Sequence, residues 1–313
     1  MRLLITGANG FVGRALSLEA IAGGLHVRAA SRSYSSFPAA IECVLVGDID
    51  KSTDWHDALR GCDAVVHLAA RAHVMHDTTS DPLVEYRSIN VDGTLNLARQ
   101  AVQAGVRRFV FMSSIGVNGA QTFGKPFSAH DAAAPHSPYT VSKHEAEVGL
   151  RVLASQTGLE LVIVRPPLVY GPGAPGNFGS LMRWLGRGWP LPLGAVTKNR
   201  RSLVGLDNLV DLIMTCVDHP RAVNQTFLVS DGDDLSTTEF LRRIGQAMNQ
   251  PSRLVPMPVA LMALAAGALG KKAVAQSLLG SLQVDISKTC ELLDWKPPMS
   301  VNEGLFRAAQ QRL

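Results

Sequence analysis

Residues 3–18 read LLITGANGFVGRALSL, and this stretch decides the fold that we predict for the chain. Leu3 to Thr6 is a short apolar run with a β-branched end, which is typical of a buried strand. A glycine-rich turn follows, and the residues from Ala15 onward are typical of a helix. Strand, glycine turn and helix in this order form the setting in which a glycine motif binds a dinucleotide.

The three glycines of the turn have separate physical roles. Gly7 permits the tight turn, Gly10 lets the backbone approach a pyrophosphate, and Gly13 lets the helix pack closely on the strand. The positive end of the helix dipole then faces the phosphate charge. The spacing is G-x-x-G-x-x-G rather than G-x-G-x-x-G. The alternative is a glycine-rich turn that binds nothing, and the strand–turn–helix context favours the dinucleotide site.

The end of the next strand bears on the choice of cofactor. His26 to Ala30 is the predicted strand, and Ser31-Arg32-Ser33 follow it. An acidic residue at this point would bind the ribose 2′-hydroxyl of NAD, and none is present. A hydroxyl and an arginine suit a 2′-phosphate, so NADP(H) is favoured and NAD(H) remains an alternative. Arg32 as a solvated loop residue is the competing interpretation.

Further strands are predicted at residues 42–46, 64–68, 108–112, 159–165 and 225–229, with helical segments between them. This alternation predicts an α/β fold, a Rossmann-like, doubly wound parallel sheet of about seven strands. We expect a smaller, mostly helical C-terminal part that binds substrate. The dinucleotide-binding domain would comprise residues 1–170 and 200–230, and the substrate-binding domain residues 171–199 and 231–313. Residues 168–177, rich in Gly and Pro, are expected to be an irregular segment at the rim of the cleft.

Composition excludes several classes of protein. The chain has 313 residues and a formal net charge of +4, and no run of five Lys or Arg indicates nucleic-acid binding. The longest apolar run, residues 259–270, is too short for an integral membrane segment. We expect a core or interface helix there, with a peripheral membrane contact as the alternative. Four separated cysteines and a strand at the N-terminus predict reduced thiols in a cytoplasmic protein.

The stretch from Tyr139 to Lys143 supplies candidate acid–base chemistry. Ser137 is a plausible N-cap and Pro138 suits the first helical position, so Tyr139 and Lys143 would lie one turn apart on one helix face. A free tyrosine has a pKa of about 10, and a neighbouring ammonium would lower that pKa. Ser114, after the strand at 108–112, would lie at the sheet edge where ligands bind. A surface contact between Tyr139 and Lys143 is the alternative, because the spacing is common.

Histidines offer little further chemistry. His67, inside a strand, is interpreted as a packed residue rather than a catalytic one. His73 and His76 with Asp77 have no third ligand at convincing spacing, so we predict loop residues and no metal site.

Taken together, these residues resemble the extended short-chain dehydrogenase/reductase family, the group of nucleotide-sugar epimerases and dehydratases. The resemblance covers essentially the whole chain. The motifs that carry it are Gly7/Gly10/Gly13, Gly47-Asp48, His67-Leu68-Ala69-Ala70, residues 90–94, Ser113-Ser114, Tyr139 with Lys143, Arg165-Pro166 and Arg201.

The resemblance implies roles for individual residues. Ser114, Tyr139 and Lys143 would be catalytic, and Ser114, Asn118, Asn177 and Arg201 would bind substrate, the arginine by a two-donor fork on the diphosphate. The residues that would bind the cofactor are Gly7, Asn9, Gly10, Phe11, Val12, Gly13, Ser31, Arg32, Asp48, Ile49, Leu68, Ala69, Ala70, Asn90, Ser113, Tyr139, Lys143, Pro166 and Val169.

Departures from the family pattern narrow the expected activity. Dehydratases carry an Asp-Glu pair after the catalytic Ser or Thr, whereas Ile115-Gly116 follow Ser114 here. Epimerases tend to keep NAD bound through an acidic residue after the second strand, and this residue is missing here. Its absence suits a reduced cofactor that exchanges between turnovers. The sequence as a whole resembles those of reductases that act on a UDP-linked 4-keto-6-deoxy-N-acetylhexosamine in bacterial surface polysaccharide synthesis. The alternatives are a UDP-hexose 4-epimerase and a non-enzymatic dinucleotide sensor.

The resemblance also bears on the oligomeric state. Relatives dimerise through the helices after Asn90 and Tyr139, so a homodimer is expected.

Overall fold

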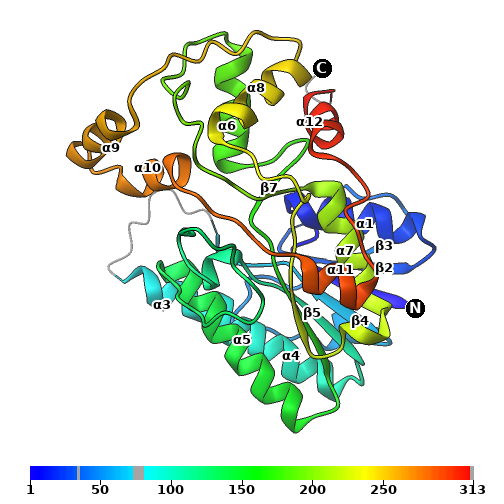
Figure 1. The fold of residues 1–313 in the computed structure, drawn as a ribbon. Coiled ribbons are helices and arrows are strands. Elements are labelled where there is room, and N and C mark those ends of the chain that lie inside the picture. Colours follow the sequence, from blue (N-terminus) through cyan, green and yellow to red (C-terminus); the bar gives the residue numbers. More distant parts are fainter. Residues whose placement is uncertain (34–35, 73–80, 311–313) are drawn as a thin grey trace.

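The computed structural model describes residues 1–33, 36–72 and 81–310. Within these residues a seven-stranded parallel sheet forms the centre of the molecule (Figure 1), as predicted from the sequence. Its strand order is β3-β2-β1-β4-β5-β6-β9, which is doubly wound with a switch between β1 and β4. The strands are β1 (Arg2–Thr6), β2 (His26–Ser31), β3 (Ile41–Leu45), β4 (Ala64–His67), β5 (Arg108–Met112), β6 (Glu160–Arg165) and β9 (Gln225–Leu228).

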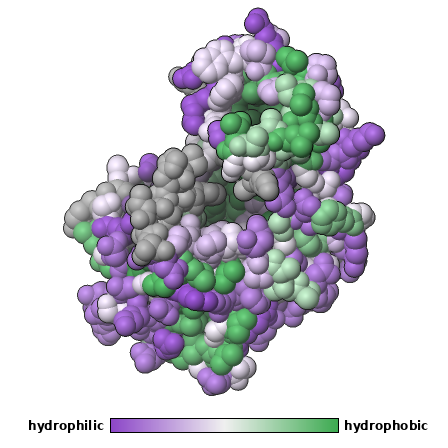
Figure 2. All heavy atoms as spheres, turned by 90° about the vertical axis from the view of Figure 1, so that its left-hand side faces the viewer, coloured by the Kyte–Doolittle hydropathy of each residue, from purple (hydrophilic) through white to green (hydrophobic). Residues whose placement is uncertain are grey.

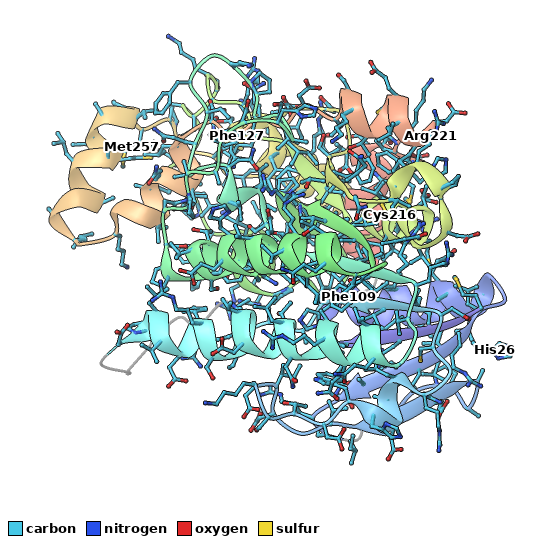
Figure 3. The ribbon with its side chains drawn as sticks, turned by 90° about the horizontal axis from the view of Figure 1, so that it is seen from below. His26, Phe109, Phe127, Cys216, Arg221 and Met257 are labelled. Carbon is cyan, nitrogen blue, oxygen red and sulfur yellow. The ribbon has the colours of Figure 1, made fainter. Side chains whose placement is uncertain are left out.

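Both faces of the sheet are buried under helices, because successive side chains along each strand point to opposite faces. Leu3 and Ile5 pack on one side and Leu4 on the other. The first face is covered by α1 (Phe11–Ala22), α7 (Leu206–Asp218) and α11 (Ser287–Leu293). The second is covered by α2 (His56–Leu59), α4 (Thr94–Gln103) and α5 (Pro138–Gln156), and Figure 3 shows α4 and α5 side by side.

The helical segment between β4 and β5 contains a feature that the sequence did not indicate. It consists of α3 (Pro82–Arg87), a π-helical stretch η1 (Ser88–Gly93) and α4. A Cβ on Gly93 would lie 2.6 Å from the Ile49 side chain, so the wide turn brings the helix backbone against the loop after β3. Short 3₁₀ turns follow at η2 (Ile115–Val117) and η3 (Pro220–Ala222).

A second lobe lies above the sheet in Figure 1 and has its own apolar core around Tyr170, Phe178 and Phe240. Its elements are α6 (Gly176–Gly186), α8 (Thr237–Ala247), α9 (Val259–Ala268), α10 (Lys272–Leu279) and α12 (Val301–Gln310). Part of the segment expected to be irregular is instead β7 (Leu168–Tyr170), which pairs in parallel with β8 (Leu203–Gly205). The buried Tyr170 hydroxyl donates to Asp231 at 2.7 Å and fixes this small sheet.

Of the core or interface helix expected at residues 259–270, the core alternative is wrong. No residue of α9 is buried, and Leu264 is 72% exposed. The helix is apolar all round and extends away from the body of the molecule, next to Met257 in Figure 3. No helix in the described ranges combines the length and the apolar character needed to cross a bilayer. The four cysteines have free thiols.

Candidate active site

The glycine turn is built as a cradle for a phosphate. Gly7 has a φ of +64°, and a Cβ there would lie 2.8 Å from the backbone nitrogen of Ala69. A Cβ on Gly13 would lie 2.2 Å from the carbonyl oxygen of Gly7, so α1 packs directly on the turn. Gly10 is the N-cap of α1 and has no side chain to cap the first N–H groups, Phe11, Val12 and Gly13 among them. These groups fit the pyrophosphate of a dinucleotide.

The end of β2 lies beside this turn. The Asn9 amide donates to the carbonyl oxygen of Ser33 at 3.4 Å, and the Ser31 hydroxyl donates to the same oxygen at 2.8 Å. Arg32 meets Asp48 at 3.5 Å, and both side chains are more than three-quarters exposed. An exposed ion pair of this kind is worth little, so the guanidinium remains accessible to a ligand phosphate.

The loop after β4 forms the facing wall. The Ala69 N–H donates to the Thr6 hydroxyl at 3.2 Å. Asn90 is buried, and its amide bonds to both backbone groups of Arg71 and to the hydroxyl of Ser142. Asn90, predicted to bind the cofactor, therefore ties this loop to α5 through its whole amide.

His67 is a packed residue, as the sequence indicated. It is fully buried, and its ring nitrogens lie 2.7 Å from the Thr6 hydroxyl and 2.9 Å from the Thr94 hydroxyl. Burial, helped by the charge of Lys143, lowers the pKa of His67 to about 3. The ring is neutral at physiological pH and bridges β1, β4 and α4.

The start of α5 sets the positions of the two candidate proton-transfer residues. Ser137 is the N-cap, Pro138 is at the first turn, and Thr140 completes a capping box that the sequence analysis missed. Tyr139 and Lys143 follow on one face of the helix. The Lys143 ammonium donates to the carbonyl oxygen of Met112 at 2.8 Å and lies 4.5 Å from the centre of the Phe111 ring.

The pKa values of this pair differ from the expectation. Burial raises the pKa of Tyr139 to about 12, and neighbouring Tyr86, whose ring centre is 6.2 Å away, adds to the rise. Burial lowers the pKa of Lys143 to about 7. The expected lowering of the Tyr139 pKa is absent, because removal from water dominates both groups.

A cavity of about 400 Å³ separates the two lobes, and Ser114, Tyr139 and Arg201 all line it. The Ser114 hydroxyl accepts the Gly116 N–H at 3.2 Å as N-cap of η2. Arg201 donates to the carbonyl oxygen of Gly280 at 3.2 Å, and burial lowers its pKa. No carboxylate in the described part of the chain forms an ion pair with Arg201. Apolar side chains supply much of the remaining wall: Ile115, Leu168, Leu181, Leu203, Phe240, Leu278 and Leu282.

Several predicted site residues lie elsewhere. Asn118 is buried away from the cavity lining, and its amide bonds to the Ser128 carbonyl and the Arg165 guanidinium. The Ser113 hydroxyl donates to Glu147 at 2.5 Å. Pro166 lines the cavity, whereas Val169 is in β7. Ile49 packs against Gly93. The Asn177 side chain, and His73, His76 and Asp77, lie outside what the structure describes, and the described residues contain no group that could hold a metal.

The sequence analysis also missed residues that line the cavity. Phe240, Gln276 and Leu278 line it together with Tyr139, although they lie more than 100 positions further along the chain. Their residue types carry no motif, so only the fold reveals them. Arg165 and Glu147 form a buried ion pair, and Glu147 accepts a hydrogen bond from Ser113. In the sequence, only the Arg165-Pro166 dipeptide pointed to this pair.

Comparison with known proteins gives consistent matches. Residues 3–230 match the model of the NAD dependent epimerase/dehydratase family. A protein of Vibrio cholerae named UDP-glucose 4-epimerase is 47% identical, with 98% of this chain and 94% of that protein covered. The crystal structure of UDP-N-acetylglucosamine 4-epimerase from Bacillus cereus superimposes with a TM-score of 0.82 at 21% identity over the whole of both chains. The structure of MoeE5 in complex with UDP-glucuronic acid and NAD superimposes with a TM-score of 0.81 at 24% identity, and the match covers 100% of this chain and 99% of that one.

Proposed function

The chain belongs to the NAD dependent epimerase/dehydratase family as an enzyme of the short-chain dehydrogenase type, and we propose that it is a 4-keto reductase. Its substrate is a UDP-linked 4-keto-6-deoxy-N-acetylhexosamine used in bacterial surface polysaccharide synthesis, and its cofactor is NADPH. The observation that carries this proposal is the end of β2, where an accessible Arg32 stands in place of an acidic residue. An exchangeable, reduced cofactor suits net reduction.

The lining of the cavity supports this class of sugar. Beside Ser114 and Tyr139 it is largely apolar, and none of its described lining residues is acidic. A C6 methyl group and an N-acetyl methyl gain from burial in such a wall, whereas a hydroxymethyl group would lose hydrogen bonds to water. Arg201, which has no carboxylate partner in the described part of the chain, would bind the diphosphate.

Three side chains perform the chemistry in this proposal. NADPH, when bound, supplies a hydride to C4. The Ser114 hydroxyl donates a hydrogen bond to the C4 oxygen and stabilises the negative charge that develops there. The Tyr139 hydroxyl gives its proton to the same oxygen, and Lys143 compensates the charge left on the phenol.

The wider arrangement extends the proposal to the whole chain. Residues 171–199 and 231–313 bind the UDP-sugar, with Asn177 at the nucleotide, and residues 1–170 and 200–230 bind the dinucleotide. A homodimer forms through α4 and α5, where Val148 and Val152 of α5 are 48% and 51% exposed.

A UDP-hexose 4-epimerase is the second candidate, and the name of the Vibrio cholerae relative favours it. Such an enzyme uses the same three side chains but oxidises and re-reduces C4 on one bound NAD. It would be purified with tightly held NAD and would convert UDP-glucose to UDP-galactose without added cofactor.

The deciding experiment gives the purified enzyme NADPH and the 4-keto sugar nucleotide and follows absorbance at the nicotinamide band. We expect NADPH oxidation that falls by about 10²- to 10⁴-fold in Tyr139→Phe. In Arg32→Asp, the preference for NADPH over NADH should fall by about tenfold or more, because a charge-assisted contact is lost. NADPH oxidation at background level, together with UDP-glucose epimerisation, would replace the proposal with the second candidate.

A further inference from the structure

An exposed apolar surface, which we call the α9 face, lies on the second lobe. It comprises Leu261 and Leu264 of α9, Leu269 at its end, Val274 of α10, and Trp184 and Trp189 in and after α6. Their exposed fractions run from 43% for Trp184 to 72% for Leu264 and Leu269. Figure 2, which views the molecule from the side of α9 and α10, shows hydrophobic residues gathered on the upper lobe around a hollow.

An apolar cavity of about 470 Å³ lies between α6, α9 and α10. Trp184, Met262, Leu269 and Val274 line it together with Lys271. A soluble protein rarely leaves a contiguous apolar surface of this kind uncovered unless it meets another molecule. The two indole rings pack edge to face with their centres 5.1 Å apart, which holds them together at the rim of the surface.

The charged residues near this face are basic. Residues 176–200 and 248–284, which form the face and its surroundings, contain seven Lys and Arg and no Asp or Glu. The acidic side chains of the lobe's other helices are Glu239 in α8 and Glu303 in α12. The basic residues Arg183, Arg187, Arg253 and Lys271 are exposed beside the α9 face. The face is therefore apolar at its centre and cationic at its edge.

We propose that the α9 face binds the surface of a lipid bilayer that contains anionic phospholipids. A helix of ten apolar residues that is followed by Lys271 and Lys272 is too short to cross the hydrocarbon core, so it can enter only the interfacial layer. Tryptophan is the side chain preferred at the boundary between headgroups and acyl chains, and basic residues gain from the negative surface potential. The cavity of the face shares Leu181 and Leu278 with the active-site cavity, so docking brings substrate exchange next to the membrane.

A second copy of the chain is a poorer occupant of this face. A symmetric contact would place the cationic edges of two such faces against each other, and like charges oppose such an association. Anionic headgroups supply the opposite charge, so the bilayer fits both features of the face.

The test is co-sedimentation of the intact enzyme with phosphatidylcholine vesicles that do or do not contain about one third phosphatidylglycerol. We expect binding at least about tenfold stronger to the anionic vesicles, and a loss of that binding as salt rises from about 0.1 M to about 0.5 M. The double variant Leu264→Glu/Leu269→Glu should bind at least about tenfold more weakly.

The matched control is Leu18→Glu/Leu45→Glu, which changes two exposed leucines of α1 and β3, at 42% and 44% exposure, outside the α9 face. This variant should bind vesicles as the unchanged protein does, and both variants should keep its thermal midpoint and NADPH affinity. The proposal fails if the unchanged protein does not sediment, if it binds neutral vesicles equally well, or if both variants lose binding alike. It also fails if only the α9-face variant alters the oligomeric state, since the face would then be a contact between copies.

Discussion

Two glutamates of α5 provide a test of how burial changes the value of an ion pair. Glu145 and Glu147 are two residues apart, and each accepts two hydrogen bonds from one arginine fork, Arg87 and Arg165 respectively. The side chains of the first pair are 33% and 47% exposed, and those of the second are 2% and 7% exposed. The two ion pairs therefore share the same helix and the same kind of contact, and they differ in how far solvent reaches their side chains.

We predict that Glu147→Gln lowers the free energy of unfolding by about 3–5 kcal/mol, because it leaves the buried Arg165 guanidinium without a counter-charge. Glu145→Gln should cost less than about 1 kcal/mol, because water already screens the surface pair. The buried change also removes the carboxylate that accepts from Ser113, next to the proposed catalytic residue Ser114. The proposed reductase activity should therefore fall further in Glu147→Gln than in Glu145→Gln.

Urea unfolding followed by far-ultraviolet circular dichroism measures both variants. The double variant Glu147→Leu/Arg165→Met should recover much of the lost stability, because the buried Arg165 charge is removed together with its partner. Equal losses for Glu145→Gln and Glu147→Gln, or no recovery in the double variant, would refute the reasoning.

Two further predictions concern the cofactor turn and the buried lysine. Gly13→Ala should weaken NADPH binding by about tenfold or more, because its Cβ would lie 2.2 Å from the Gly7 carbonyl oxygen. The control variant Gly158→Ala places its Cβ in open space and should bind NADPH normally. A fluorescence titration with NADPH measures both. Burial depresses the pKa of Lys143 from 10.5 to about 7, so the unfolded chain binds one more proton than the folded protein between these values. Stability relative to Lys143→Met should therefore rise as pH increases from about 7 towards 10, and urea unfolding at several pH values that shows no such rise would contradict the assignment.

The sheet was predictable because each of its strands is a short apolar run with a clear end. The run at residues 108–112 matches β5 at both ends, and the glycine turn fixed the order of strand and helix at the N-terminus. The second lobe was harder. β7 has only three residues and depends on the contact between Tyr170 and Asp231, which are 61 positions apart. The π-helical turn depends on the approach of Gly93 to Ile49, which no local pattern encodes.

The candidate site divides in the same way. Gly7 and Gly13 act through the backbone, and Tyr139 and Lys143 through one turn of helix, so their spacing in the sequence was enough to predict them. Residues that act through partners far away in the chain leave no such spacing and could not be predicted. Asn118 looked like a substrate ligand, but Arg165 and Ser128 occupy its amide in the interior. The exposure of α9 was also hidden, because an apolar helix of ten residues has the same pattern whether it is buried or not.

The raised pKa of Tyr139 sets the protonation state of this side chain at neutral pH. A phenol whose pKa is about 12 is protonated at neutral pH, so it can donate a proton without first losing one. Reduction of a ketone needs that form, because the oxygen at C4 gains a proton as it becomes an alcohol. Epimerisation begins with the opposite step, in which a phenolate must accept a proton from the sugar hydroxyl. An enzyme that starts there has to lower this pKa on binding its ligands, against the burial that Tyr86 and the surrounding walls impose. The protonated phenol is the form that donates in the reductive step of both candidate reactions, so the cofactor, rather than this pKa, distinguishes a reductase from an epimerase.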